Sequence, residues 1–411
     1  MSETNVEVTQ EPLAPPVQVS RLHVDGYRAL EGFDAHLGPL TVLIGANATG
    51  KSSLLDLLGM LSFVAVNPIP PEVDPRSVGK RLFHAGSPER IHLSLQVVGS
   101  DGRVLQYAVQ LAGPLGSTRV VSEQLVALDE KAADGQQAVL SEFLDFKNGK
   151  GSIRTQVWNE DRLHPLISSW TLPPNELALR RALDPNLRVI SGFREFVSGW
   201  RFYTGFDVGM TAALRRPVLS EPEPWLREDG ANLSAVLFHL MTESPERWGE
   251  LETHLRSAIP SFQSLTVKAR GGSGMVMGIW REEGVKDELT LADLSDGTLR
   301  LLCWLVLCLA PVRPPFICID EPEVGLHPRV LPVLAGVLRL ASTETQLLVT
   351  THSPYFLSQF SLEEIAVMKK VDGRALFVRP SSNEALRQEV EELGSAGLAQ
   401  LHLSDELEGR A

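Results

Sequence analysis

The sequence predicts an α/β fold with a mixed β-sheet, and three observations support this. A glycine-rich loop separates an apolar strand at 40–44 from a helical pattern at 52–61. A second apolar strand, 316–319, ends in two carboxylates, and a third, 347–349, leads to a histidine. Strands that are apolar throughout are typical of sheets covered on both faces by helices, which is the arrangement of α/β proteins.

The composition is that of a folded, acidic protein. The 411 residues carry 51 acidic and 38 basic side chains, a formal net charge of −13, and 43% are hydrophobic. At about 150 residues per domain, the length predicts two or three domains. The acidity argues against a protein that coats nucleic acid through bulk charge, so any DNA contact must come from a local groove of a dimer or from a partner.

Neither export nor membrane insertion is expected. The three cysteines, Cys303, Cys308 and Cys318, lie in apolar runs without the spacing of a zinc site or a disulfide framework, which fits a reducing cytoplasm. The N-terminus lacks a basic and apolar signal region, and no apolar run is long enough to span a bilayer. The sequence therefore predicts a cytoplasmic protein in which the first two cysteines belong to a helical core.

Five segments are expected along the chain. Helical patterns such as 233–241 and 248–259 mark the middle of the sequence. No internal repeat or heptad array is visible, so a long coiled-coil arm is not expected. The predicted order is a disordered tail (1–18), a lobe with the glycine-rich loop (19–119), an inserted, mostly helical subdomain (120–260), a second lobe (261–380) and an acidic C-terminal segment (381–411).

The glycine-rich loop predicts a nucleotide site. It fits the pattern GxxxxGK[ST] between a strand and a helix, where glycines let successive backbone N–H groups point at one phosphate and the helix N-terminus adds its dipole. Lys51 is expected to reach the β- and γ-phosphates of ATP, and the Ser52 hydroxyl to bind Mg²⁺. The loop residues are Gly45, Ala46, Asn47, Ala48, Thr49, Gly50, Lys51 and Ser52, and Ser53 joins them in the predicted site.

The two later strands supply the chemistry that such a site needs. Asp320 is expected to hold Mg²⁺ through water, and Glu321 to act as the general base on the attacking water. His352 can hydrogen-bond the γ-phosphate and the same water. An acidic pair after a strand is usually only a solvated strand end, and a lone histidine is usually structural. Their order after a phosphate loop favours the functional interpretation.

A second anion site is predicted at 294–298 (LSDGT). Ser295 and the backbone N–H of Gly297 lie where a helix is expected to begin, and a helix N-terminus attracts anions. The segment is too far round the sheet to join the first loop. We therefore expect it to bind the γ-phosphate that another protomer holds.

Taken together, the motifs resemble an ABC-type ATPase of the branch that contains SMC, RecF and the overcoming-lysogenisation-defect proteins. Within it the chain is most similar to the stand-alone AAA family ATPases of prokaryotic anti-phage defence operons. The middle of the chain resembles that group only loosely, through 201–207, 215–217 and 229–233. The matching motifs are YRAL (27–30), GANATGKS (45–52), LSDGT (294–298), ICIDEPEVGLHP (317–328) and VTTHSP (349–354).

The resemblance implies a head-to-tail homodimer that sandwiches two ATP molecules, with higher assemblies left open. The segment 325–328 would then be the D-loop at that interface, and Arg28 would lie near the nucleotide. Two departures stand out. No clear Q-loop glutamine follows the phosphate loop, and His84, Ser87 or Gln96 stay open for that place. The sequence also ends a short way after the VTTHSP motif, which we expect leaves no room for the nuclease domain of overcoming-lysogenisation-defect proteins.

Two functions follow from the resemblance. The first is an ATP-hydrolysing dimeric switch, the sensor subunit of a defence complex that controls a separate, operon-encoded effector such as a nuclease. The second is a DNA repair or recombination ATPase, similar to RecF, that acts directly on DNA. The ATPase of a membrane transporter is disfavoured, because such subunits normally show a clear Q-loop glutamine and lack a long helical insertion.

Three further clusters have a structural interpretation that we prefer. Residues 200–203 (WRFY) could stack on bases, but they fit a core strand better. The acidic residues of 381–411 could mask a groove for DNA, but a solvated helix is favoured. Pairs of basic residues could line such a groove, but more often they are partners of carboxylates. These pairs are Arg180 with Arg181, Arg215 with Arg216, and Lys268 with Arg270.

Overall fold

The computed structural model describes most of the chain and confirms the predicted α/β class with a mixed sheet. The predicted tail lies outside the described residues except for its last three, which begin strand β1 (Pro16–Asp25). The described residues are 16–69, 82–84, 88–113, 117–129, 138–159, 162–184, 186–220, 225–404 and 406–410.

A central sheet of six strands carries all three predicted apolar strands side by side. Its order is β10-β15-β16-β3-β17-β18, and every neighbouring pair is parallel except the β17–β18 hairpin at one edge. Parallel strands end at the same edge of a sheet, so the residues that follow them are brought together. The strands are β3 (Leu40–Ile44), β10 (Arg201–Tyr203), β15 (Phe316–Asp320), β16 (Gln346–Thr350), β17 (Ile365–Val371) and β18 (Arg374–Val378).

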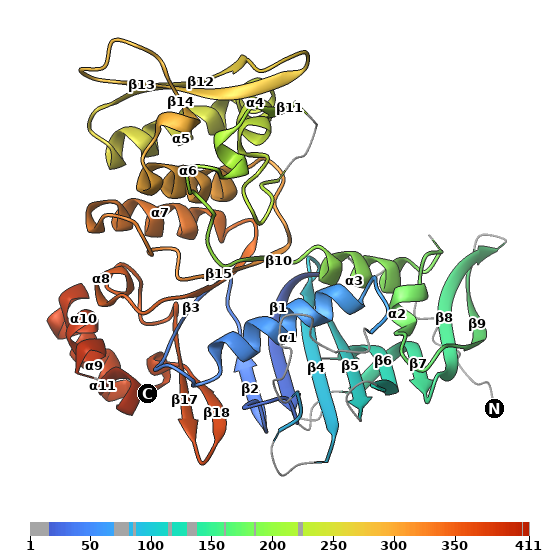
Figure 1. The fold of residues 1–411 in the computed structure, drawn as a ribbon. Helices are drawn as coiled ribbons and strands as arrows, with labels where there is room; N and C mark the ends of the chain where they lie inside the picture. The colour runs from blue at the N-terminus through green and yellow to red at the C-terminus, as the bar shows by residue number, and fades with distance from the viewer. Residues whose placement is uncertain are drawn as a thin grey trace, which may run out of the picture.

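An antiparallel sheet of eight strands forms the second layer, in the order β2-β1-β4-β5-β6-β7-β8-β9. Helices α1 (Lys51–Val64) and α3 (Arg188–Ser198) lie across it, and α2 (Ala178–Arg181) flanks α3 (Figure 1). The strands not yet given are β2 (Phe33–His36), β4 (Arg90–Gly99), β5 (Val104–Ala112), β6 (Arg119–Asp129), β7 (Ala138–Lys147), β8 (Lys150–Asn159) and β9 (Arg162–Thr171).

The expected helical insertion at 120–260 needs correction. Its first half continues the antiparallel sheet as β6 to β9, and among the described residues of this range the first helix begins at Ala178. The strand signal is present at the end of β7, where Leu144 and Phe146 are buried while Asp145 between them is only half-buried and Lys147 is exposed, because alternate side chains of a strand face opposite sides. The helical pattern of 233–259 is genuine, but it does not extend backwards over the residues of β6 to β9.

A third group of elements forms the upper lobe of Figure 1. Helix α6 (Asp296–Leu309) is its centre and is buried on every side from Leu301 to its end, which confirms that Cys303 and Cys308 are core residues. Trp200 and Tyr203 are also buried, so 200–203 is a core strand and its approach, as predicted. Around α6 lie α4 (Leu233–Glu243), α5 (Pro245–Ala258), α7 (Leu331–Ala341), β11 (Val218–Leu219), β12 (Phe262–Ala269), β13 (Met275–Glu282) and β14 (Leu289–Thr290).

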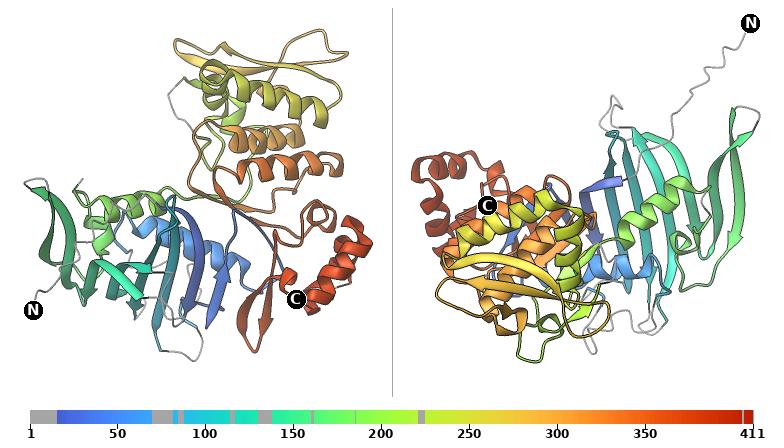
Figure 2. Two further views of the ribbon diagram at one scale, coloured as in Figure 1. Left: turned by 180° about the vertical axis from the view of Figure 1, so that it is seen from behind. Right: turned by 90° about the horizontal axis from the view of Figure 1, so that it is seen from above.

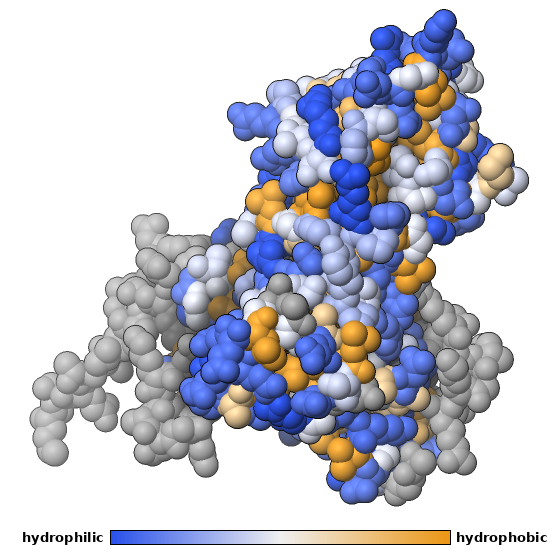
Figure 3. All heavy atoms as spheres, turned by 90° about the vertical axis from the view of Figure 1, so that its left-hand side faces the viewer, coloured by the Kyte–Doolittle hydropathy of each residue, from blue (hydrophilic) through white to orange (hydrophobic). Residues whose placement is uncertain are grey.

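The acidic C-terminal segment is helical and packs against the central sheet. Leu386, Leu398, Leu401 and Leu407 are buried in the same core as α6, while the side chains of Glu384, Glu391, Glu392 and Glu406 are exposed. Figure 2 shows these helices beside β17 and β18. On the face that Figure 3 shows, hydrophobic residues are scattered among hydrophilic ones. The segment contains α9 (Glu384–Leu393), α10 (Ser395–Leu403) and α11 (Glu406–Arg410), and η4 (Pro380–Ser382) leads into it. Helix α10 packs against α8 (Pro354–Leu357), which follows β16.

Within the described part of the chain, we find no helix that combines the length and the hydrophobicity needed to cross a lipid bilayer.

One buried carboxylate ties the antiparallel sheet to the helices that cover it. Glu123 of β6 is 1% exposed and accepts hydrogen bonds from the backbone N–H groups of Ala178 (2.5 Å) and Leu179 (2.9 Å) and from the Tyr107 hydroxyl (3.0 Å). Burial raises the pKa of Glu123 to about 7. The folded protein therefore holds this proton more tightly than the unfolded chain, and the associated stability is lost as the pH rises through about 7.

We predict that Glu123→Ala lowers the free energy of unfolding by about 3 kcal/mol at acidic pH, because three buried donors lose their acceptor. The difference from the wild type should narrow as the pH rises through about 7 in urea unfolding. Glu142→Ala is the matched control, since this half-buried carboxylate of β7 accepts from the Gln124 side chain, at 3.1 Å, and not from buried backbone groups among the described residues. A pH-independent difference would contradict the linkage.

A candidate nucleotide-binding site

The phosphate loop lies between β3 and α1, where glycine is required at two positions. Gly45 has φ +146°, and a Cβ there would lie 2.1 Å from the carbonyl oxygen of Met368 on β17. Gly50 has φ +114° and begins α1 in a left-handed conformation. Thr49 closes the turn between them, since its hydroxyl donates to the Ala46 carbonyl at 2.9 Å. Larger residues at either glycine would push the loop off β17.

The side chain of Lys51 folds into the hollow of this loop. Its ammonium donates to the carbonyl oxygens of Gly45 (2.5 Å) and Ala46 (3.2 Å), and only 9% of the residue is exposed. A buried ammonium needs such acceptors to offset the loss of water. The positive charge is thus held at the place where the sequence predicts phosphates.

A pocket of about 340 Å³ brings together residues from both ends of the chain. Of the predicted site residues, those that line it are Arg28, Asn47, Ala48, Gly50, Lys51, Ser52, Ser53, Asp320, Glu321 and His352. The phosphate loop and the tips of β15 and β16 meet there because β16 pairs in parallel with both β3 and β15. Ser295 and Gly297 do not line this pocket.

The acidic pair adopts two different arrangements. Asp320, the last residue of β15, lies opposite Thr350 and accepts a hydrogen bond from its hydroxyl. Glu321 has φ +49°, a left-handed conformation that strains any residue but glycine. Its backbone N–H reaches the Thr350 hydroxyl at 3.2 Å. Its carboxylate lies 3.7 Å from Nε2 of His352, so the predicted base and the predicted switch histidine face each other across the pocket.

The surroundings of His352 favour its neutral form. Burial lowers the pKa of its imidazole, and the nearby positive charge of Lys51 lowers that pKa further, while Glu321 acts in the opposite direction. A neutral imidazole has one nitrogen that donates and one that accepts, so it can bind a water molecule or a phosphate oxygen.

Two residues that line the pocket, Ser52 and Asp320, fit a magnesium ion that is bound jointly by the protein and by phosphates. The Ser52 hydroxyl and the Asp320 carboxylate come from α1 and β15 and line the same pocket. Mg²⁺ prefers oxygen ligands and is usually bound by one or two carboxylates plus substrate phosphates and water.

Arg28 lies at the pocket in an unusual backbone conformation, with φ +48°. Its guanidinium pairs with Asp56 of α1 at 2.5 Å, so the side chain is anchored to the helix that begins with Lys51. Of the open Q-loop candidates, His84 contacts the Arg28 carbonyl at 2.6 Å but does not line the pocket, and Gln96 lies in β4 beside Gln106. Ser87 lies outside the described residues.

Four residues of the site region were not predicted. Ala29 and Lys370 line the pocket, Asp56 pairs with Arg28, and Glu323 holds the histidine loop. The Glu323 carboxylate accepts from the Thr351 hydroxyl (2.5 Å) and from the His352 backbone N–H (3.3 Å), and burial raises its pKa. The sequence does not distinguish Glu323 from a solvated carboxylate in a turn. The motif DEPE (320–323) contains three acidic residues, and nothing in it indicates which of them is buried.

The second predicted anion site begins α6. Ser295 is exposed, and its hydroxyl caps the helix by accepting from the Thr298 N–H at 3.2 Å. Gly297 packs against the predicted D-loop, since a Cβ at Gly297 would lie 3.2 Å from the Gly325 carbonyl oxygen. A Cβ at Gly325 would in turn meet the Arg300 side chain at 2.2 Å. The two segments predicted to meet a partner protomer therefore lie side by side.

Comparison with known proteins gives one family. A family model described as "AAA domain, putative AbiEii toxin, Type IV TA system" matches residues 40–358. No match is found among curated proteins.

Three solved structures are similar to the chain. One is an SMC head bound to the C-winged helix domain of ScpA, with a TM-score of 0.51 and 13% identity over 88% of this chain and 97% of that one. Another is the SMC head domain from Thermotoga maritima, with a TM-score of 0.44 and 12% identity over 88% and 98% of the two chains. The third, derived from Pyrococcus furiosus, is an SMC head with an extended coiled coil bound to the C-terminal domain of ScpA. It has a TM-score of 0.49 and 11% identity over 92% and 99%. At these identities the first structure shows a shared fold and no more.

We predict that Glu323→Ala lowers the rate of nucleotide turnover about tenfold while nucleotide affinity stays unchanged, because the backbone at His352 loses its anchor but the phosphate loop is intact. Steady-state turnover and binding of a fluorescent nucleotide measure the two effects. Glu363→Ala, an exposed change in the same lobe, is the control. Equal losses of affinity and turnover would show that Glu323 supports the whole site instead.

Proposed function

The chain belongs to the AAA domain family of the matched model, and from this premise we propose that two copies close head to tail around two ATP molecules and hydrolyse them. Its family and its SMC-head fold confirm the predicted ABC-type P-loop ATPase branch. One observation carries the proposal. The chain gathers Lys51, Glu321 and His352 in one pocket, yet it presents the exposed cap of α6 outside that pocket. A second copy supplies the missing side of the site.

We propose that hydrolysis proceeds by attack of water on the γ-phosphorus. Lys51 exchanges the carbonyls of Gly45 and Ala46 for the β- and γ-phosphate oxygens. Glu321 takes the proton of the attacking water on its carboxylate, and His352 orients that water and a γ-phosphate oxygen. The bond between the γ-phosphorus and the bridging oxygen breaks, and ADP leaves with the electron pair. Ser52 and Asp320 would hold Mg²⁺, which would supply charge neutralisation on the phosphates.

In the cell we propose that this ATPase is the sensor or regulatory subunit of an anti-phage defence complex with a separate effector. Two facts support this. The description of the matched family names a putative toxin of a type IV toxin–antitoxin system, and the similar SMC head was solved with a domain of a partner protein. A comparable surface on this chain would receive the operon-encoded effector, and the ATP-bound dimer would be the state that this effector senses.

Direct action on DNA is the second candidate, favoured by the SMC-head fold. Against it, most of the basic residues considered for a DNA groove are already partners of carboxylates. Arg180 and Arg181 pair with Glu176, and Lys268 pairs with Glu288. The purified chain distinguishes the two functions, since ATP-dependent binding of duplex DNA favours repair. Copurification with the product of a neighbouring gene favours the defence subunit.

We predict that Glu321→Gln slows ATP turnover by about 10²–10⁴-fold, because the amide cannot accept the proton of the attacking water. ATP binding is retained, so the ATP-bound dimer should persist longer than that of the wild type in light scattering with ATP and Mg²⁺. Glu283→Gln, an exposed change beyond β13, should behave like the wild type. A dimer lifetime equal to that of the wild type would remove Glu321 from the role of base.

We predict that Ser295→Arg abolishes turnover while each chain still binds ATP, because a large cation then occupies the helix end that is to meet the partner's γ-phosphate. Nucleotide binding, turnover and thermal unfolding are compared with those of Ser404→Arg, an exposed change at the end of α10. Ser295→Thr, which keeps the cap, should retain activity. Undiminished turnover of Ser295→Arg would rule out the sandwich.

A further inference from the structure

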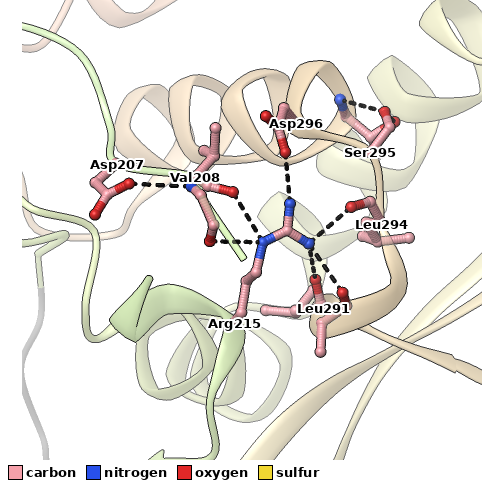
Figure 4. Close-up of polar contacts among 10 residues, drawn as sticks. Asp207, Val208, Arg215, Leu291, Leu294, Ser295 and Asp296 are labelled. Atoms are coloured by element: carbon pink, nitrogen blue, oxygen red, sulfur yellow. Dashed lines mark hydrogen bonds and ion pairs between the residues drawn. The ribbon is translucent and has the colours of Figure 1, made fainter. Parts of the chain in front are cut away.

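Arg215 is a buried arginine that does not line the nucleotide pocket, and neither proposed function uses it. It ends the short helix η1 (Ala213–Arg215) and is 5% exposed. From the sequence, Arg215 is expected to be one of the basic residues that pair with carboxylates. The structure places it inside the upper lobe, against the start of α6 (Figure 4).

The guanidinium joins two separate segments of the chain. A guanidinium offers its N–H donors in one rigid plane, so it can hold several acceptors at fixed angles. Its donors reach both the loop after β10 and the segment that leads into α6. The contacts are Nε to the carbonyls of Val208 (2.8 Å) and Gly209 (3.1 Å), Nη1 to those of Leu291 (3.4 Å), Ala292 (2.9 Å) and Leu294 (2.8 Å), and Nη2 to the Asp296 carboxylate (2.7 Å).

The segment that Arg215 holds on one side is the one that carries Ser295. The acceptors on Leu294 and Asp296 flank this serine directly. The 3-10 turn η2 (Leu291–Asp293) precedes them and provides two further acceptors. With these carbonyls fixed, the cap of α6 has one orientation.

The segment on the other side starts at the sheet edge that also carries Asp320. Strand β10 pairs in parallel with β15, and Tyr203 lies opposite Ile319. The chain therefore leaves β10 at the same edge at which Asp320 ends β15, and it reaches Val208 and Gly209 only a few residues later. Arg215 thus links the loop that follows β10, the neighbour of β15 in the sheet, to the segment that is to serve the partner's site.

We propose that Arg215 is a positioning residue that holds the 291–296 segment so that Ser295 meets the γ-phosphate bound by a second copy of this chain. The inference rests on the proposed head-to-tail dimer. It assigns Arg215 to the trans half of the composite site, although the residue is buried inside its own chain. Its loss removes the orientation of Ser295 and leaves the chain's own phosphate loop intact.

Mixing of inactive variants tests this assignment. R215A should lower ATP turnover by about 10²-fold, because a small misplacement of a catalytic group is enough for such a loss. ATP affinity of the separate chain should stay unchanged. When R215A is mixed with K51A, one composite site of the mixed dimer has an intact phosphate loop from R215A and an intact Ser295 segment from K51A. Turnover that neither variant shows alone should therefore appear.

A parallel mixture keeps the inference separate from the proposed dimer. K51A mixed with S295R should also restore turnover if the sandwich is right. If this control mixture stays inactive, the head-to-tail dimer fails and the inference fails with it. If the control mixture is active while K51A with R215A is not, the dimer stands and Arg215 does not act through the trans half.

Two further variants guard against a simple loss of folding. R216A changes the exposed neighbour, whose guanidinium donates to the Thr211 carbonyl at 3.1 Å, and should leave turnover, affinity and thermal unfolding as in the wild type. R215K keeps the charge but not the planar set of donors. We expect it to fold, to bind ATP normally and to show an intermediate turnover that K51A restores by mixing. Wild-type turnover of R215K or of R215A would overturn the proposal.

Discussion

Parallel hydrogen bonding among β3, β16 and β15 brings three strand ends to one edge of the central sheet. The residues that follow these strands come from distant parts of the sequence, yet the parallel pairing places them next to one another. Lys51 follows β3, Glu321 follows β15 and His352 follows β16. The strands are buried on both faces, so a shift in their register would expose apolar side chains. The geometry of the site is therefore stabilised by the core beneath it.

The molecule holds its buried charges in ways that separate structural from chemical roles. Arg215 and Glu123 are satisfied mainly by backbone groups, with one side-chain partner each, and each fastens one segment to another. Lys51 is also held by backbone carbonyls, but these belong to a loop whose N–H groups can receive phosphates. Exchange of one set of partners for another costs little when the charge never returns to bulk water. Arg215 and Glu123 are therefore fixed anchors, whereas Lys51 can exchange its carbonyl partners for a ligand.

The sequence was most informative where local chemistry alone defines a structure. The phosphate loop could be predicted because glycine, lysine and serine at fixed spacing serve one geometry, and Ser295 because a helix cap is local. Strands β6 to β9 were missed, since their pairing depends on residues far apart and a helical pattern nearby suggested the wrong continuation. The roles of Arg215 and Glu323 could not be predicted either. Their partners are backbone atoms and loop residues that only the folded chain brings near.

The left-handed backbone at Glu321 has a consequence for the evolution of this protein. A residue with a side chain is strained by about 1 kcal/mol at such a φ angle, whereas glycine is not. Glycine at this position would therefore stabilise the fold and remove the carboxylate that faces His352. Under the proposed mechanism stability and activity are opposed at this one residue, so selection for stability alone would lead to an inert protein with the same architecture.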